Sequence, residues 1–239
     1  MKRSRLLLPG LLLLLVMLAA ACSPPPELRD QKLLNDDSLI TGEPCEAPCW
    51  RGITPGVTAW SEALTILEDD RTIEDPTTQT ADDSSAVAAS FKEPGGIDAS
   101  GQIFSDNGNT VGLIFLRLAP DMTLDEVLAK YGDPTWVIGT PFSDDPPQAI
   151  VNLVYPDEQM IVYVFVPGKE GALDGTNEIV GVLYMQASDM ETLLKTSSLH
   201  AWEGLADFAT YGPDSPFEVT PEPTAEGTQE ATPEATAAQ

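Results

Sequence analysis

The stretch MIVYVFV, residues 160–166, is the most apolar of the β-prone runs in the chain. Its β-branched and aromatic residues favour an extended strand, and the lack of polar alternation indicates that both faces are buried. We therefore expect this strand to lie in the middle of a sheet. The turn-forming residues 156–159, Pro-Asp-Glu-Gln, return the chain from the preceding apolar run at 149–155, which predicts an antiparallel hairpin.

Further strand and helix signals alternate on both sides of this hairpin. Asn107-Gly108 separates two β-prone runs and predicts a second hairpin, because both residues tolerate positive φ. A helix of about ten residues is expected to begin at Thr58, because apolar residues recur there at helical spacing. That apolar face consists of Trp60, Ala63, Leu64 and Leu67. The remaining strands are expected at residues 86–91, 102–104, 110–118, 135–138 and 179–186.

A second helix is predicted to begin after Thr123. Thr123 and Glu126 have the spacing of a capping box, in which each side chain bonds to the backbone amide of the other residue. Gly132-Asp133-Pro134 ends this helix. A last helix is expected over residues 188–208, with a break near Ser197-Ser198.

These elements predict an α+β globular domain over residues 45–212. Ile53-Thr54-Pro55-Gly56-Val57-Thr58 and Leu118-Ala119-Pro120-Asp121-Met122-Thr123 share a proline, an apolar residue and a threonine at the same places, each before a helix. This similarity favours two tandem units at residues 52–117 and 118–187, each a helix followed by antiparallel strands, with the last helix after them.

The second unit carries a resemblance to known families. Met122-Thr123-x-x-Glu126-Val127, followed by Tyr131-Gly132-Asp133-Pro134, resembles the helix-to-turn motif of the small lipoprotein in the outer-membrane β-barrel assembly machine. The motif is also similar to one in the tandem-repeat β-lactamase-inhibitor-protein fold. The resemblance implies helices packed on a short antiparallel sheet, with the sheet or its loops binding another protein. It implies no particular binding residue.

The amino terminus has the three parts of a secretory signal. Basic residues at positions 2, 3 and 5 precede the apolar run Leu6–Leu18, and Ala19-Ala20-Ala21 lead to Cys22. The apolar run is 13 residues long, short of the roughly 20 residues that span a bilayer, so a transmembrane helix is the weaker interpretation. The alternative is an ordinary signal peptide with a cysteine nearby by chance.

Small residues before Cys22 resemble the lipobox of bacterial lipoproteins. The resemblance implies that residues 1–21 are removed, that Cys22 carries diacylglycerol, and that the protein is extracytoplasmic and bound to a membrane through this lipid. Residues 22–44 are then expected to form a flexible tether, in which Leu33, Leu34, Leu39 and Ile40 can dock on the domain or form a short helix.

The charge excludes one class of partner. The chain has 12 basic and 38 acidic residues, a net charge of −26. Removal of residues 1–21 leaves nine basic against 38 acidic residues, a net charge of −29. Nucleic acid is therefore not expected as a partner, because phosphate binding needs clustered cations. Residues 213–239, with glutamate at every fourth position among Thr, Ala and Pro, are predicted to be a disordered acidic tail.

Cys45 and Cys49 are predicted to form a disulfide. Export exposes them to oxidising conditions, and the bond would fix the chain just before Trp50. Free thiols are the alternative. A thioredoxin-like redox role does not fit, because that motif places two residues between its cysteines.

The sequence contains no convincing catalytic or metal-binding set. His200 is the single histidine, no Gly-x-Ser-x-Gly motif occurs, and the paired aspartates do not fit a calcium loop. No catalytic residue, cofactor or metal ligand is therefore expected. The expected function is a non-enzymatic protein-binding or envelope-assembly module whose partner is an envelope protein. The alternatives are a cell-envelope carbohydrate-binding protein and a carboxylate-dependent hydrolase, and no oligomeric state is predicted.

Overall fold

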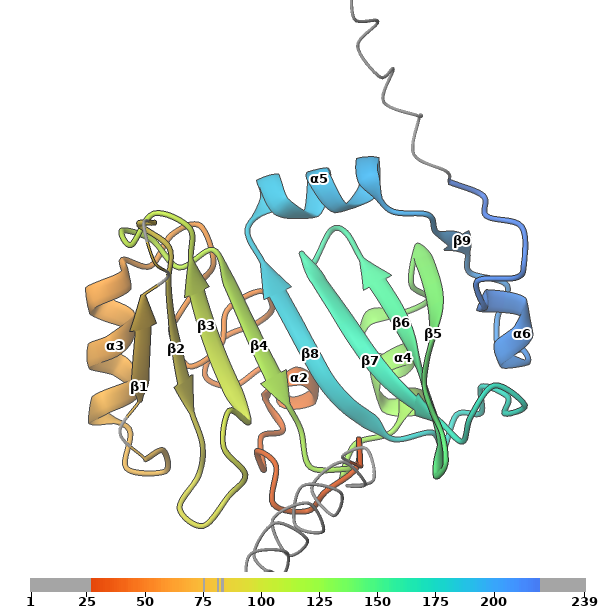
Figure 1. The fold of residues 1–239 in the computed structure, drawn as a ribbon, viewed down its shortest axis with the longest axis horizontal. Helices are drawn as coiled ribbons and strands as arrows, with labels where there is room; N and C mark the ends of the chain where they lie inside the picture. Colours follow the sequence, from red (N-terminus) through yellow and green to blue (C-terminus); the bar gives the residue numbers. More distant parts are fainter. Residues whose placement is uncertain (1–26, 75, 81, 83, 220–239) are drawn as a thin grey trace, which may run out of the picture.

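The fold, seen in a computed structural model, is built on one nine-stranded antiparallel sheet in the order β1-β2-β3-β4-β8-β7-β6-β5-β9 (Figure 1). The structure describes residues 27–219 except 75, 81 and 83. The α+β class is confirmed, with strands dominating. The described helices are α2 (Ser38–Thr41), α3 (Trp60–Asp69), α4 (Leu124–Tyr131), α5 (Ala187–Thr196) and α6 (Phe208–Tyr211), and the strands are β1 (Thr77–Thr80), β2 (Val87–Phe91), β3 (Gly101–Ser105), β4 (Leu113–Arg117), β5 (Trp136–Asp144), β6 (Pro147–Tyr155), β7 (Met160–Val166), β8 (Ile179–Met185) and β9 (His200–Ala201).

Strand β7 has the bounds predicted for MIVYVFV and lies inside the sheet between β8 and β6. Six of its seven residues are buried and only Tyr163 is partly exposed. The hairpin with β6 is confirmed by the pairing of Tyr155 with Met160. The hairpin around Asn107-Gly108 is confirmed as well, because β3 and β4 pair from Gly101–Leu116 to Phe104–Leu113.

Two similar halves meet where β4 pairs with β8. Helix α3 precedes β1–β4 and helix α4 precedes β5–β8, and each set of four strands is consecutive in the sheet. The junction runs antiparallel from Leu113–Met185 to Arg117–Gly181. A Cβ atom at Gly181 would lie 2.8 Å from the carbonyl oxygen of Leu116. Only glycine therefore allows the two strands to approach this closely.

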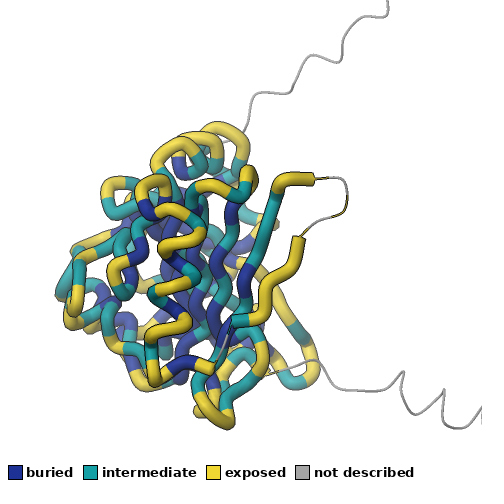
Figure 2. Tube along the Cα trace, turned by 90° about the vertical axis from the view of Figure 1, so that its left-hand side faces the viewer, coloured by how far each residue is buried: buried dark blue, intermediate teal, exposed yellow. Residues whose placement is uncertain are grey.

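The two faces of the sheet are covered differently. On one face, Leu39 of α2, Ala63 and Leu67 of α3, and Leu124 and Val127 of α4 join the main hydrophobic core. On the other face, α5 alone contributes helical residues, and it packs over a smaller cluster at one end of β6–β8. Figure 1 looks onto this second face, with α2 and α4 behind the sheet. Figure 2 shows the buried segments in the interior and exposed ones on the outer sides of the helices and at β1.

The capping box at the start of α4 is present. The Glu126 carboxylate accepts hydrogen bonds from the Thr123 backbone amide at 2.8 Å and from its hydroxyl at 2.9 Å. These bonds, which favour the charged carboxylate, lower the pKa of Glu126. The first predicted helix is also present, although α3 begins at Trp60 rather than Thr58. The Thr58 hydroxyl instead accepts a bond from the Thr54 amide.

The boundary between tether and domain, predicted at residue 45, is wrong. Leu33, Leu34 and Leu39 are each 1% exposed, and Leu34 forms an isolated bridge with Leu118 at the end of β4. Helix α2 packs beside α4, and the Tyr131 hydroxyl donates to the Leu39 carbonyl. These leucines therefore dock on the domain. The free energy gained by burying three apolar side chains exceeds the conformational entropy lost when the segment is ordered.

The predicted helix over 188–208 is also wrong beyond residue 196. Helix α5 ends at Thr196, and His200 and Ala201 form the edge strand β9 against Val137 and Trp136. The predicted start of the disordered tail at 213 is too early, because Val219 still bridges Leu199. Edge pairing and packing against β5 override helical propensity here. Residues 220–239 of the predicted tail lie outside the described residues.

Candidate functional site

The face of the sheet opposite α2, α3 and α4 carries a band of partly exposed apolar side chains, which we call the open face. Paired residues in neighbouring strands share a face, and the register pairs Phe104 with Leu113 and Phe115 with Leu183. Leu183 in turn pairs with Ile161 of β7. The band therefore crosses β3, β4, β8 and β7 without interruption, and spans the junction of the two halves.

Phe115 and Tyr163 form the centre of this band. Their ring centroids lie 5.7 Å apart with the rings at 88°. Gly181 pairs with Tyr163 and adds no side chain between the two rings. Burial raises the pKa of Tyr163 to about 12. Its hydroxyl has no hydrogen-bond partner among the described residues, so the band offers one free polar group at its centre.

The open face is nearly free of charge in a strongly acidic chain. Within the nine strands the only acidic residue is Asp144, at the tip of the β5–β6 hairpin, and the only Lys or Arg is Arg117. Arg117 lies on this face, on the same side of β4 as Phe115, and the other polar strand residues there are amides and hydroxyls, such as Gln102, Ser90 and Asn152. The acidic residues are therefore gathered in helices, turns and termini around a surface whose central strands carry one cation, Arg117, and no carboxylate.

Hollows flank the aromatic band. Phe104 lines two of them, a cavity of about 280 Å³ toward β1 and β2 and one of about 270 Å³ toward Asp189 of α5. A third, of about 340 Å³, lies between β5–β7 and α5 and is lined by Ile138, Ile150, Tyr163 and Leu193 among others. These hollows can receive protruding side chains, the geometry by which interface anchors are bound.

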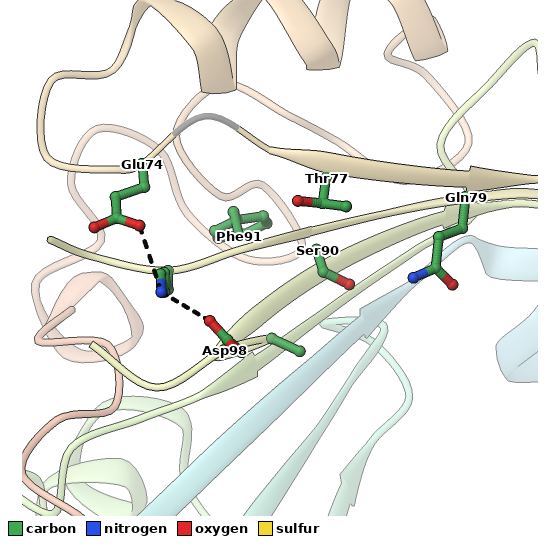
Figure 3. A pocket seen from close by; sticks show the side chains of 8 residues that line it. Glu74, Thr77, Gln79, Ser90, Phe91 and Asp98 are labelled. Atoms are coloured by element: carbon green, nitrogen blue, oxygen red, sulfur yellow. Dashed lines mark hydrogen bonds and ion pairs between the residues drawn. The ribbon is translucent and has the colours of Figure 1, made fainter. Parts of the chain in front are cut away.

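A more polar cavity of about 440 Å³ lies at the β1–β2 end of the open face (Figure 3). Lys92 is its only cation. Its Nζ lies 2.7 Å from Asp98 Oδ1 and 3.5 Å from Glu74 Oε2. Thr77, Gln79 and Ser90 complete the wall, with Phe91 at its base.

This Lys92 cavity brings two carboxylates together, as a glycoside hydrolase requires, but the neighbouring cation does not suit the acid that such an enzyme uses. Such an enzyme needs one carboxyl with a raised pKa to act as acid. Here the hydrogen bond and charge of Lys92 lower the pKa of Asp98, and Asp98 in turn raises the pKa of Lys92. Lys92 thus pairs with both carboxylates, and Asp98 is not set up as a proton donor.

The structure confirms the predicted disulfide. Cys45 and Cys49 are bonded, with 5.6 Å between their Cα atoms. Trp50, the next residue, is fully buried, stacks on Phe91 at 5.2 Å, and donates from Nε1 to Asp36 at 3.0 Å. The bond therefore constrains the chain directly before a fully buried residue of the core. Cys22, the predicted lipidation site, lies outside the described residues.

Other residues considered for chemistry have structural roles. His200 is buried, with its ring nitrogens 3.0 and 3.2 Å from the carbonyl oxygens of Pro216 and Gly212 and its ring stacked on Phe217. Two of the paired aspartates, Asp36 and Asp70, bind Arg51. No three acidic, histidine or cysteine side chains within the described ranges gather as a metal site would require.

Sequence reasoning missed the open face and the Lys92 cavity. β1 is not among the predicted strands, because Thr77–Thr80 has no apolar alternation, and all four of its residues are exposed. One signal for the open face was present in the sequence LIFLR of β4. A strand with one face in the core and the other in water alternates apolar and polar residues, whereas β4 has apolar residues on both sides.

Comparison with known proteins gives no match: no family model, no curated protein and no solved structure is similar to the chain. The helices described between residues 27 and 219 are all too short or too polar to cross a membrane.

Proposed function

We propose that the protein is a lipid-anchored, extracytoplasmic bacterial module that binds a partner protein through the open face, without catalysis. The observation that carries the proposal is the apolar band around Phe115 and Tyr163, whose strands β3, β4, β7 and β8 hold no carboxylate, in a chain of net charge −26. Aromatic side chains with a free polar tip, bordered by hollows, are typical of the energetic centres of protein interfaces.

The chemistry of the face specifies the partner. A protein that covers it needs its own apolar patch, with a side chain that accepts or donates a hydrogen bond at the Tyr163 hydroxyl. Acidic residues border the face, with Asp106 and Asp189 lining one hollow and Glu74 and Asp98 lining the Lys92 cavity. A basic rim around the partner's patch would complement these carboxylates and speed association.

The organisation of the chain supports the same proposal. A helix followed by four consecutive strands occurs twice, as expected for tandem units at 52–117 and 118–187. The families that the Met122–Pro134 motif resembles use such sheets to bind other proteins. The predicted signal and Cys22 place the protein outside the cytoplasm, where an envelope protein is the available partner.

The competing hydrolase is less well supported, because Lys92 pairs with both carboxylates that line the Lys92 cavity. For a carbohydrate-binding protein, the tryptophans would be the expected surfaces for stacking on sugars. Three of the tryptophans instead stack or pack inside: Trp50 on Phe91, Trp202 on Tyr211, and Trp60 on the core.

The proposal is tested with the full-length lipoprotein in solubilised envelope membranes, comparing wild type, Phe115→Ser and Val57→Ser. Phe115 lies on the open face, whereas Val57 is 77% exposed in a loop before α3. Loss of an interface anchor should weaken partner recovery at least about tenfold. A partner that is lost with Phe115→Ser and kept with Val57→Ser supports the proposal, and equal recovery with both variants contradicts it.

A further inference from the structure

We propose that the end of the sheet formed by the β5–β6 hairpin and the β7–β8 loop rests against the headgroup surface of the bilayer that holds Cys22. The inference rests on the proposed lipid anchor. It adds the orientation of the domain. The strands run away from the membrane surface, so the plane of the sheet is steep to the membrane and the open face is not directed at the bilayer.

The first argument is how the chain joins the domain. The Leu28 amide donates to Gln148 Oε1 at 2.7 Å, at the start of β6. Arg29 Nη1 donates to Glu178 at 2.8 Å, and its guanidinium lies 4.2 Å from the centroid of the Phe165 ring. Both residues are therefore bound at the same end of β6, β7 and β8.

Chain length then limits the distance to the lipid. Cys22 and Leu28 are six residues apart, so they can be separated by at most about 21 Å, whatever the conformation between them. A flexible tether reaching to Cys45 would instead allow roughly 80 Å. Docking of residues 28–34 thus shortens the reach several-fold and keeps this end of the sheet near the bilayer.

The opposite end is far from the anchor. Strand β6 runs from Pro147 to Tyr155, and at about 3.3 Å per residue its two ends are roughly 26 Å apart. Figure 1 shows the described chain beginning at the lower end of the sheet, whereas α5 and the segment after it, with which Val219 forms a bridge at Leu199, lie at the upper end. The described chain therefore ends on the side away from the anchor.

Exposed apolar side chains mark the lower end as a contact surface. Phe142, 43% exposed, lies at the bulge of β5 next to the residues that pair with Ala149 and Gln148. Leu205, 52% exposed, precedes Ala206, whose carbonyl accepts from the Leu173 amide in the β7–β8 loop. These are two of the three large apolar side chains that are exposed in the described part of the chain, the other being Val57.

Charge at this end is partly neutralised. Lys169 of the β7–β8 loop lies 3.2 Å from Asp144 at the hairpin tip. Arg29 likewise pairs with Glu178. This pairing lowers the repulsion between an acidic domain and anionic headgroups, while aromatic and aliphatic side chains such as Phe142 suit the interface between water and lipid.

The test uses two variants of the full-length lipoprotein that each add one cysteine, Asp145→Cys and Asp157→Cys, labelled with a fluorophore under conditions that keep Cys45 and Cys49 bonded. Both aspartates are exposed in hairpin turns, one at each end of β6. The acylated proteins are reconstituted in phosphatidylcholine vesicles containing lipids with a nitroxide quencher on the headgroup. We expect several-fold stronger quenching at position 145 than at position 157.

Equal quenching at the two positions, or stronger quenching at 157, would overturn the orientation while leaving the anchor intact. Mass spectrometry of the same samples tests the lipid anchor separately from the orientation. A chain without diacylglycerol on Cys22 would overturn both the anchor and the orientation. A flexible insertion of about 20 residues after Ser23 should remove most of the quenching at 145. Unchanged quenching there would contradict the short connection as its cause.

Discussion

The rings of Phe115 and Tyr163 meet at 88° with centroids 5.7 Å apart, and so join β4 to β7 across β8. The contact links the two halves of the sheet on its uncovered face. Gly181 keeps the space beside Tyr163 open. The same two rings thus join the two halves and present aromatic surface to a partner.

This ring contact should be measurable as a coupling free energy. Phe115→Leu, Tyr163→Leu and the double variant form a cycle whose interaction energy we expect at about 0.5–1.5 kcal/mol, from urea unfolding. A coupling near zero would show that the rings are neighbours without stabilising the junction.

Alkaline pH should destabilise the fold through its tyrosines. Burial raises the pKa of all five, Tyr131, Tyr155, Tyr163, Tyr184 and Tyr211, and that of Tyr163 reaches about 12. The folded-state pKa values exceed the ordinary value of 10. The contribution of these tyrosines to the unfolding free energy is therefore complete below pH 10 and is lost as the pH rises toward and above 12.

Absorbance at the tyrosinate band, followed together with circular dichroism, checks this prediction. Tyrosine ionisation should begin well above pH 10 and accompany unfolding. In Tyr163→Phe, the loss of unfolding free energy between pH 10 and 12 should be smaller than in the wild type. A native protein that titrates most of its tyrosines at pH 10 would disagree with the burial described here.

The disulfide should stabilise the domain modestly. Its ring is small, so replacing both Cys45 and Cys49 by serine should cost about 2 kcal/mol of unfolding free energy, measured with urea. Fluorescence of Trp50, which the bond precedes, should report looser packing. Reducing agent should destabilise the wild type by a similar amount and leave the double variant unchanged.

Lipidation should depend on Cys22 alone. We expect the mature amino terminus of the wild type to carry a diacylglyceryl mass on Cys22, with residues 1–21 absent, and Cys22→Ser to abolish both changes. The Cys45→Ser and Cys49→Ser variants serve as controls and should be modified normally. An unmodified Cys22 in a mature secreted chain would contradict the anchor.

Local patterns predicted much of the fold. The two-sided apolar run at 160–166, the Asn107-Gly108 turn and the Thr123–Glu126 capping box each depend on residues close in sequence, and each is present. The docking of Leu33 and Leu34 depends instead on residues such as Leu118, more than 80 positions away. No periodicity within residues 22–44 indicates that contact.

The open face illustrates a second limit. Strand sequences show which residues are apolar, but coverage of a face depends on where the helices pack. Both faces of β4 are apolar in LIFLR, yet Ile114 and Leu116 are buried whereas Phe115 is partly exposed, because no helix covers its side. The Lys92 cavity likewise needs Glu74 and Asp98 to meet from different loops.

Photo-crosslinking in living cells tests the central proposal most directly. A benzophenone side chain is placed in the full-length lipoprotein at Phe115 on the open face, or at Thr65, which is exposed on α3 over the other face. We predict one discrete protein adduct from position 115 that disappears when Leu183→Asp is added, and none from position 65. No adduct at 115, or the same adduct from both positions, would contradict binding through the open face.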